Sequence, residues 1–271
     1  MYAMPIHVIL KPYMDKFCLI TNLSAGDFVP NAMIEKSNVT NLPLDTISDL
    51  GTTLIAFWHK HGNIPLLMWK SDVSQAYHRM PMPKCWQMKQ IHTIEGEHHV
   101  DCCNNFGGKG GYGIWSAFMS LVVWIAWHLL HIHFFVYVDD NFSFEHAEAL
   151  LFHAHSSCRL PSQQARLLNL WDYIGLLYED QKQEFSSTLC IIGFIIDPNT
   201  MTMTIPDDAH MKLLSSISNF LNIANTDHRH MLHEFQALVG YVNWALNIYI
   251  LGCSGLSILY SKIAGKTKPN T

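Results

Sequence analysis

Three aspartates at the ends of two apolar segments are the residues whose types and spacing could do chemistry. Asp72 ends the stretch "IPLLMWKSD" (residues 64–72), and Asp139 and Asp140 directly follow "HFFVYV" (133–138). Adjacent carboxylates beside apolar residues repel each other and lose hydration, so they need a compensating partner. If the two segments are neighbouring strands, the carboxylates converge, and a hard cation such as Mg²⁺ would neutralise them. Two such ions about 4 Å apart would stabilise the attacking and leaving oxygens of a phosphoryl displacement.

The same residues have a plainer interpretation, which stays open. An Asp-Asp-Asn sequence is common at the tip of a solvated hairpin, and a single aspartate at a strand end is weak evidence of a site. The prediction of a metal site therefore rests on Asp72, Asp139 and Asp140 as a set.

The elements that must position these aspartates make the middle of the chain α+β and its C-terminal part helical. In order, we expect a helix over 42–62 with Asp45 as its N-cap and Gly62 at its end, a strand over 64–72, a hairpin over 86–101 turning at Glu95-Gly96, a glycine-rich loop over 104–113, a helix over 114–130, the aspartate hairpin, a helix over about 145–176, a hairpin over 189–206 turning at Asp197-Pro198-Asn199, and helices from 206 to about 263. No internal repeat or long linker divides the chain.

Length and composition indicate a folded protein with a substantial core. The chain has 271 residues, is 49% hydrophobic and has a net charge of −5, so any surface that attracts nucleic acid must be local. Its seven cysteines are irregularly spaced without a CxxC pair, and the N-terminus lacks the pattern of a signal peptide. We therefore expect an intracellular protein, of the cytoplasm or nucleus, with reduced thiols.

Two other interpretations are open at this point. Residues 113–138 contain no Asp, Glu, Lys or Arg and are long enough to cross a bilayer. The change from a helical to a β-rich pattern near His131 favours a buried helix followed by a buried strand, and no membrane. Histidines at 131–133, 153–155 and 228–233 offer zinc ligands, but none forms an HExxH motif, and packing or surface roles fit them better.

An ordered set of motifs in this chain resembles the reverse transcriptases. The segments "SDVSQAYHRMP" (71–81), "FGGKGG" (106–111) and "YVDD" (137–140) occur in the order and spacing of motifs A, B and C of that family. Four further segments extend the likeness over nearly the whole chain, namely 16–26 to the fingers, 172–183 to motif D, 189–203 to motif E and 233–252 to the thumb of retrotransposon enzymes of the DIRS-like group. Each motif is weak alone, and the ordered set is specific.

The resemblance implies roles for the matching positions. Asp72 and Asp139 would bind two Mg²⁺ ions, or Mn²⁺ in their place, with Asp140 assisting and the carbonyl of Val73 completing a metal shell. Lys182 would be a general acid near the pyrophosphate, although a solvated lysine is nearly as good an interpretation. The residues expected to bind the nucleotide are Lys16, Ser74, Gln75, Ala76, Tyr77, Phe106 and Gly107. Among them, Tyr77 would be the steric gate that excludes a 2′-hydroxyl, or else simply a packed aromatic.

As a whole, the resemblance implies an α+β right-hand polymerase core, with fingers and palm over 1–205 and a helical thumb over 206–271. Its activity would be RNA-directed DNA synthesis from dNTPs on an RNA or DNA template with a primer. Two features depart from the pattern. Cys18 stands where the family has an arginine that clamps the triphosphate, and Tyr112 stands where it often has proline. A catalytically decayed remnant that at most binds nucleic acid is therefore an alternative.

Overall fold

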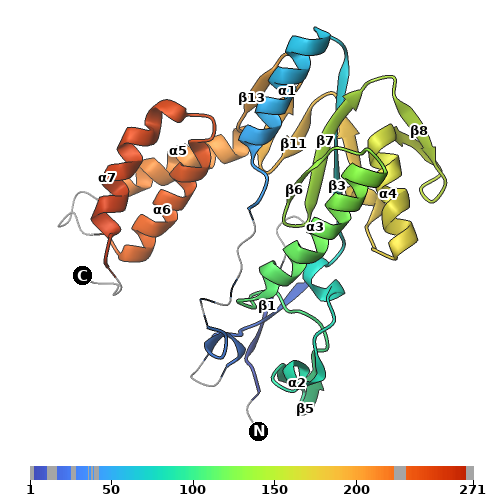
Figure 1. Ribbon diagram of the computed structural model, residues 1–271. Helices are drawn as coiled ribbons and strands as arrows, with labels where there is room; N and C mark the ends of the chain where they lie inside the picture. Colours follow the sequence, from blue (N-terminus) through green and yellow to red (C-terminus); the bar gives the residue numbers. More distant parts are fainter. Residues whose placement is uncertain are drawn as a thin grey trace. The chain divides into compact units, whose positions relative to one another are not determined.

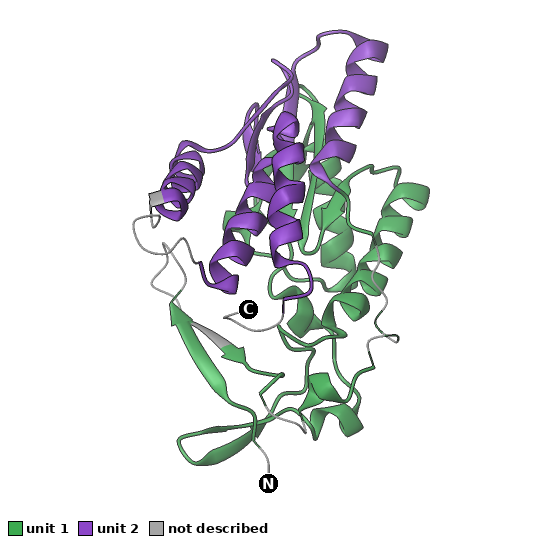
Figure 2. Cartoon of the chain, turned by 90° about the vertical axis from the view of Figure 1, so that its left-hand side faces the viewer, with its two compact units in different colours: residues 1–45, 69–184 green, residues 46–68, 185–271 purple. Residues whose placement is uncertain are grey.

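The chain folds into two compact units, which Figure 2 colours separately. The computed structural model describes residues 3–10, 17–25, 29–35, 37, 39, 43–222 and 230–266. Unit 1 is formed by residues 1–45 and 69–184, and unit 2 by residues 46–68 and 185–271. This division follows packing. The expected functional boundary between residues 205 and 206 lies elsewhere and stays a prediction.

Unit 1 contains most of the strands and the long helix α3. Its elements are β1 (Ile6–Leu10), β2 (Phe17–Thr21), the 3-10 turn η1 (Pro30–Ala32), the end of β3 (Leu66–Asp72), η3 (Ala76–Arg79), α2 (Lys84–Gln87), β4 (Ile91–Ile94), β5 (Glu97–Val100), α3 (Gly111–Leu129), β6 (Phe135–Tyr137), β7 (Asp140–His146), β8 (Leu150–His153), β9 (Cys158–Pro161), α4 (Ser162–Ile174), η4 (Asp180–Lys182) and the start of β10 (Glu184–Ser186). The central sheet has the order β10-β3-β7-β6, and Figure 1 labels its strands β3, β7 and β6. Strands β3 and β10 each contain residues of both units. The expected strand over 64–72 and the hairpin turning at Glu95-Gly96 are confirmed.

The two adjacent aspartates lie at a tight hairpin, as the sequence predicts. Strands β6 and β7 are antiparallel, with Tyr137 opposite Asp140 and Phe135 opposite Phe142. The turn between them therefore consists of Val138 and Asp139 alone. This register places the carboxylates of Asp139 and Asp140 at one end of the strand pair, while Phe142, two residues further along β7, is buried.

One apolar cluster forms the core of unit 1. Trp115, Met119, Val122 and Ala126 line one face of α3 at helical spacing and are all buried. The other members of the cluster come from the central strand, from α4 and from the loops beside them: Trp69, Val73, Ala76, Ile132, Phe134, Leu160, Ala165, Leu167, Leu168, Leu170, Trp171 and Leu176. The sheet that holds the aspartates thus packs against large buried side chains, which restrict its movement.

The charge-free stretch over 113–138 is divided between α3 and β6. Helix α3 is long and apolar enough to cross a membrane by length and composition, and 22% of its most apolar window is buried. It ends at Leu129, however, and β6 follows as a paired strand of the central sheet. Figure 1 shows α3 passing across β6 and β7. We therefore interpret α3 as a core helix that leaves one apolar face exposed, including Leu121 and Trp124.

The helix expected over 145–176 is wrong in its first half. Strand β7 continues to His146, and the hairpin β8–β9 precedes α4, which covers only Ser162–Ile174. The carboxylate of Glu145 explains where the helix begins, since Oε2 accepts hydrogen bonds from Ser162 Oγ (3.0 Å) and Gln163 N (2.8 Å). An anion is favourable at a helix N-terminus. Glu145 therefore stabilises the start of α4 although it belongs to strand β7.

Unit 2 is mainly helical. Its elements are α1 (Ile47–His61), the start of β3, the end of β10, the strands β11 (Leu189–Ile191), β12 (Phe194–Asp197) and β13 (Thr202–Thr204), and the helices α5 (Asp207–Asn222), α6 (Leu232–Ala245) and α7 (Cys253–Ile263), with the 3-10 turn η6 (Ile250–Gly252) before the last. The helical C-terminal part ending at Ile263 is as expected. The region over 189–206 is a three-stranded meander, because a turn at Ile192-Gly193 precedes the expected one at Asp197.

The N-terminus of α1 corrects the expected cap. Thr46 is the N-cap, and it forms a capping box with Asp49, whose Oδ2 accepts from Thr46 N at 2.7 Å. Asp45 instead accepts a hydrogen bond from Val136 N through Oδ2 (2.7 Å), which ties it to β6 in unit 1. The predicted end of the helix at Gly62 is confirmed.

Candidate functional site

Backbone contacts join the end of β3 to the β6–β7 turn. Val73 N donates to the carbonyl oxygen of Asp139 at 3.3 Å. The amide of Asn141, which is fully buried, donates to the same oxygen at 3.0 Å and to the carbonyl of Ser71 at 3.5 Å. Asp72 and the two adjacent aspartates are therefore held at the same end of one sheet. Asn141 was not among the residues predicted from the sequence, although a polar residue directly after the aspartates, at the start of an apolar strand, is a usable signal.

The turn that carries Asp139 has an unusual backbone conformation. Val138 has a φ of 59°, in the left-handed region that β-branched residues rarely adopt. The indole Nε1 of the buried Trp115 donates to the carbonyl of Val138 at 2.6 Å and holds the turn in this state. Strain of this kind costs about 1–3 kcal/mol and persists only where surrounding contacts determine it. Here those contacts fix the position of Asp139.

Burial and mutual repulsion disfavour the charged forms of these carboxylates. The pKa of Asp140 is raised to about 6, chiefly by burial and then by the charges of Asp139 and Asp72. Burial also raises the pKa of Asp139, and the charge of Asp72 adds to this effect, while the charge of Lys182 opposes it. The three carboxylates are thus close enough to influence one another, and a cation placed among them would be stabilising.

Lys182 is the basic side chain in contact with Asp72. Its Nζ lies 2.5 Å from Asp72 Oδ2 and 3.4 Å from Glu179 Oε1. The neighbouring Gln183 donates from Nε2 to the carbonyl of Asp72 at 3.3 Å. The segment resembling motif D is therefore attached to the end of β3, with Lys182 beside Asp72. The expected role of Lys182 as a general acid near the pyrophosphate stays a prediction.

The loop after β3 brings Tyr77 towards the turn of the hairpin. Ser74 is buried, and its N donates to the carbonyl of Leu177 at 3.0 Å. Gln75 is exposed with a φ of 54°, and the buried Ala76 begins η3. Tyr77 is partly buried, and its pKa is raised first by burial and then by the charge of Asp139. The phenol is therefore close enough to Asp139 to feel its charge, and the expected role of Tyr77 as a steric gate stays a prediction.

The glycine-rich loop lies against the same tyrosine. The rings of Tyr77 and Phe106 are 4.8 Å apart between centroids and nearly perpendicular at 76°. Gly107 has a φ of 88°, which favours glycine, and its carbonyl accepts from Asn31 Nδ2 at 2.9 Å. Asn31 Oδ1 also accepts from Lys109 N at 2.7 Å, so Asn31 braces the loop from both sides. Asn31 was missed because its partners are distant in sequence.

Two predicted positions cannot be placed. Lys16 lies outside the described residues. The backbone of Cys18 is described in β2, where it pairs with Ile9, but its side chain lies outside the described part. The expected contact of this region with a triphosphate therefore stays a prediction.

The carboxylate oxygens of Asp72, Asp139 and Asp140 are the donor type that Mg²⁺ prefers. Their common position at one sheet end fits such an ion. Among the described residues, however, no three His, Cys, Asp or Glu side chains form a group that could hold a metal ion as they stand. Since Asp72 Oδ2 is held by Lys182, a metal would require rearrangement of at least that contact. The same finding covers the described histidines considered above as zinc ligands.

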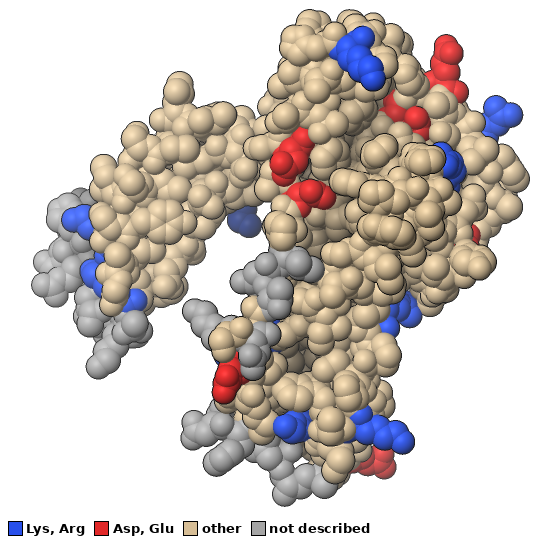
Figure 3. Space-filling model, viewed as in Figure 1, with Lys and Arg blue, Asp and Glu red and all other residues tan. Residues whose placement is uncertain are grey.

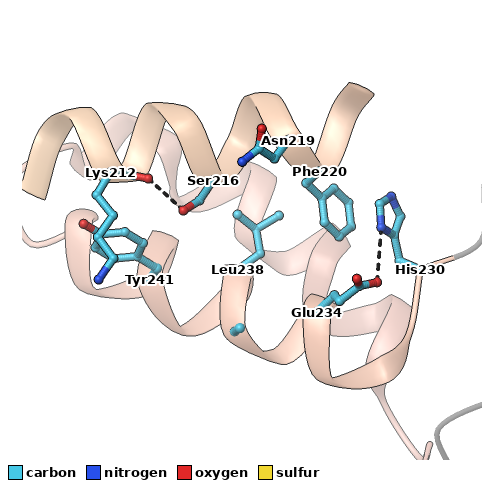
Figure 4. Close-up of a pocket in the computed structure, with 9 residues that line it drawn as sticks. Lys212, Ser216, Asn219, Phe220, His230, Glu234, Leu238 and Tyr241 are labelled. Carbon is cyan, nitrogen blue, oxygen red and sulfur yellow. Dashed lines mark hydrogen bonds and ion pairs between the residues drawn. The ribbon is translucent and has the colours of Figure 1, made fainter. Parts of the chain in front are cut away.

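A cavity lies between α5 and α6 of unit 2 (Figure 4). It has a volume of about 340 Å³ and none of the predicted site residues lines it. Figure 4 shows Phe220 beside His230, whose rings stack at 3.7 Å between centroids, and Glu234 within 3.5 Å of His230 Nδ1. The stack of Phe220 on His230 joins α5 to the residues that precede α6.

Positive charge is sparse on the surface shown in Figure 3. On that face the described Lys and Arg side chains are scattered, and most of the surface is uncharged. The whole chain has 17 Lys and Arg against 22 Asp and Glu. A protein that grips a nucleic acid duplex normally presents a positive track to the phosphates.

No family model and no curated protein matches this sequence. The structure is similar to solved structures of a foamy viral protease-reverse transcriptase. The form designated dRH, in complex with double-stranded DNA, matches 99% of this chain and 40% of its own, with 18% identity and a TM-score of 0.59. A complex with an RNA/DNA hybrid matches 99% and 31% of the two chains, with 17% identity and a TM-score of 0.57.

A third structure of the foamy viral enzyme, also with double-stranded DNA, matches 99% of this chain and 48% of its own, with 18% identity and a TM-score of 0.58. This chain therefore spans less than half the length of the structures that it resembles. At such low identity the likeness concerns the fold. The fold of this chain, a mixture of helices and sheets, is reverse-transcriptase-like.

Proposed function

We propose that this chain is the polymerase core of a reverse transcriptase and adds deoxynucleotides to a primer on an RNA or DNA template. The observation that carries the proposal is the convergence of Asp72, Asp139 and Asp140 at one end of a sheet in a reverse-transcriptase-like fold. In the reaction, the 3′-hydroxyl of the primer attacks the α-phosphate of a dNTP and pyrophosphate leaves.

The carboxylates would hold the catalytic metal ions in this proposal. Asp72 and Asp139 would hold two Mg²⁺ or Mn²⁺ ions, with help from Asp140 and the carbonyl of Val73. Such ions, when bound, neutralise charge on the attacking and leaving oxygens. Burial of Asp139 and Asp140 supports this role, because a partly dehydrated carboxylate gains more from a cation than a solvated one.

The residues around Tyr77 would select and orient the nucleotide. Tyr77, braced by Phe106, would block a 2′-hydroxyl, and Gly107 would allow close approach of the base pair. The backbone at Ser74, Gln75 and Ala76 would contact the triphosphate, together with Lys16. Lys182 would donate a proton to the leaving pyrophosphate once it is released from Asp72.

The partners and architecture follow from the same proposal. The foamy viral structures contain double-stranded DNA or an RNA/DNA hybrid, which supports a primer–template as the partner here. Residues 1–205 would act as fingers and palm, and residues 206–271 as a thumb. The motifs that resemble those of retrotransposons support an origin in such an element, of the DIRS-like group.

A catalytically decayed remnant that only binds nucleic acid is the second candidate. It is favoured by Cys18, where a clamping arginine is expected, and by the low content of Lys and Arg. Such a protein would retain the fold, because packing of the core does not depend on the clamp.

Primer extension with the purified chain tests the proposal. The assay uses a labelled DNA primer on an RNA template, all four dNTPs and Mg²⁺, with a matched reaction containing EDTA. We expect Mg²⁺-dependent extension. Binding of the same primer–template without extension, at any metal concentration, would instead support the remnant.

A further inference from the structure

Lys182 makes its closest contact with a carboxylate that the proposed reaction needs. Its Nζ lies 2.5 Å from Asp72 Oδ2, compared with 3.4 Å from Glu179 Oε1. The Asp72 side chain is only 17% exposed, whereas that of Glu179 is 44% exposed. The shorter contact therefore joins the ammonium to the less hydrated of the two carboxylates, where a charge-assisted hydrogen bond is strongest.

The segment around Lys182 is held in place by contacts other than this ion pair. Gln183 Nε2 donates to the carbonyl of Asp72 at 3.3 Å, and Ser74 N donates to the carbonyl of Leu177 at 3.0 Å. Val73 also forms an antiparallel bridge with Tyr178. The segment that carries Lys182 is thus attached to the end of β3 on both sides, through Leu177 and Tyr178 before it and the side chain of Gln183 after it.

The charges around this contact indicate what the lysine does there. Burial and the negative charge of Asp72 both raise the pKa of Asp139 and of Asp140. The positive charge of Lys182 acts in the opposite direction on both carboxyl groups. Lys70 also acts on Asp140, but its Nζ pairs with Glu184 Oε1 at 3.0 Å. Lys182 therefore supplies the positive charge that is in direct contact with the carboxylate cluster.

We propose that Lys182 is a built-in counter-cation that occupies Asp72 Oδ2 and that a divalent cation must displace to bind this site. This inference rests on the proposed function only in assuming that the site takes a divalent metal. It accounts for the finding that the described residues contain no preformed metal-holding group even though three carboxylates converge. Lys182 and the metal compete for one oxygen, so in the resting site the ammonium supplies part of the positive charge that a bound metal would otherwise supply.

The test measures metal binding directly, with Mn²⁺ as the probe. Free Mn²⁺ is counted by electron paramagnetic resonance during titration of the full chain, for the wild type, Lys182→Met and Lys182→Gln. Partly exposed ion pairs of this kind correspond to at most about a fivefold effect. We expect both variants to bind Mn²⁺ about two- to fivefold more tightly than the wild type.

Lys70→Met is the matched control, because it removes a nearby positive charge that forms an ion pair with Glu184. It should change the Mn²⁺ affinity by less than about twofold. An equal gain in affinity in Lys70→Met and Lys182→Met would overturn the proposal, because it would show that removing any nearby positive charge has the same effect. An Asp72→Asn background provides a second control. There the effect of Lys182→Met should disappear, because the contested oxygen no longer carries charge.

The proposal is overturned if the Lys182 variants bind Mn²⁺ no more tightly than the wild type, including the case in which no protein binds it. Circular dichroism verifies the fold of each variant, and two substitutions are used so that one misfolded variant does not decide the result. Its failure is separable from that of the proposed function. If the wild type extends a primer but the Lys182 variants bind Mn²⁺ no more tightly than the wild type, only the counter-cation proposal is rejected. If the Lys182 variants bind Mn²⁺ more tightly but the wild type does not extend a primer, only the polymerase proposal is rejected.

Discussion

Tyr77 stands edge-on against Phe106, with ring centroids 4.8 Å apart and an angle of 76° between the ring planes. The first residue follows the strand that ends in Asp72, and the second belongs to the glycine-rich loop. Contacts of this geometry stabilise aromatic pairs by about 0.5–1.5 kcal/mol beyond area burial. The contact between the two rings therefore gives the surface formed by Tyr77 and Phe106 a defined shape, which a flexible loop would not have.

Replacing Tyr77 tests whether this wall selects the sugar. Tyr77→Val removes the ring and should admit ribonucleotides while retaining part of the deoxynucleotide incorporation. Tyr77→Phe keeps the ring and should keep the selection. Single-nucleotide addition with dNTP and rNTP gives the ratio for each protein, and an unchanged ratio in Tyr77→Val would show that the ring is only a packing residue.

The raised pKa of Asp140 predicts how stability depends on pH. Its pKa is about 6 in the folded chain against 3.8 ordinarily, first because of burial and then because of Asp139 and Asp72. Between these two pH values the folded state retains a proton that the unfolded state has released, so the free energy of unfolding falls as the pH rises. Asp140→Asn should remove this fall and stabilise the metal-free protein near neutral pH, as measured by urea denaturation at about pH 4 and pH 7.

Asp197 provides a control of opposite sign. Burial raises its pKa, but hydrogen bonds from Asn199 and Thr200 outweigh this and lower the pKa below the ordinary value. Its contribution is present above the ordinary pKa and is lost as the pH falls. Asp197→Asn should therefore reduce stability at neutral pH. If both variants shift the pH profile in the same direction, the assignment of the effect to Asp140 is wrong.

The sequence predicted the parts of this fold that depend on local pattern. The strand ending at Asp72 and the turn at Glu95-Gly96 follow from apolar runs and turn residues within a few positions. The segment over 145–161 was mistaken for helix, because it becomes a strand end and a hairpin only through partners elsewhere. Glu145 illustrates the difficulty, since its role is to stabilise a helix that begins after Pro161.

The same distinction holds for the candidate site. The aspartates could be predicted because their type and spacing carry the chemistry, and their common position at one sheet end follows from strand order. The contacts of Asn141, Trp115 and Asn31 could not, because each bonds to a backbone atom that only the folded chain brings near. The pairing of Lys182 with Asp72 likewise joins residues far apart in the sequence.

A glycine in unit 2 tests the packing of the β11–β12 turn. Gly193 has a φ of 83°, and a Cβ there would lie 3.2 Å from Trp244 Cζ2, a ring that also stacks on Phe194 at 4.9 Å. Gly193→Ala should lower the free energy of unfolding by about 1–3 kcal/mol, because both the backbone conformation and the contact are unfavourable. Gly51→Ala is the control, since this helical position has open space around it. It should raise stability by about 0.5–1 kcal/mol. Equal effects in urea denaturation would contradict the packing described for Trp244.

Cys18 motivates a prediction about activity. An arginine there would give one or two charge-assisted hydrogen bonds to a triphosphate, each contributing about 1.5–3 kcal/mol. Their absence would weaken dNTP capture or transition-state stabilisation by about ten- to 150-fold per bond. We expect weak wild-type activity at ordinary dNTP concentrations and a gain in apparent dNTP affinity or kcat in Cys18→Arg. A dNTP titration of steady-state incorporation measures this. Full activity of the wild type would contradict the clamp argument. So would a Cys18→Arg variant with no gain in apparent dNTP affinity or kcat, if Asp139 is shown to be essential for activity.

Mg²⁺-dependent primer extension by the wild type and by Asp139→Asn tests the central claim most directly. Asp139 lies at the strained turn and is partly dehydrated, so its replacement removes a proposed metal ligand and relieves repulsion at the same time. The account predicts extension by the wild type, loss of extension in Asp139→Asn, and a thermal unfolding midpoint in EDTA that is equal or higher in the variant. Extension by Asp139→Asn at the wild-type rate, or a wild type that binds primer–template and never extends it, would contradict the account.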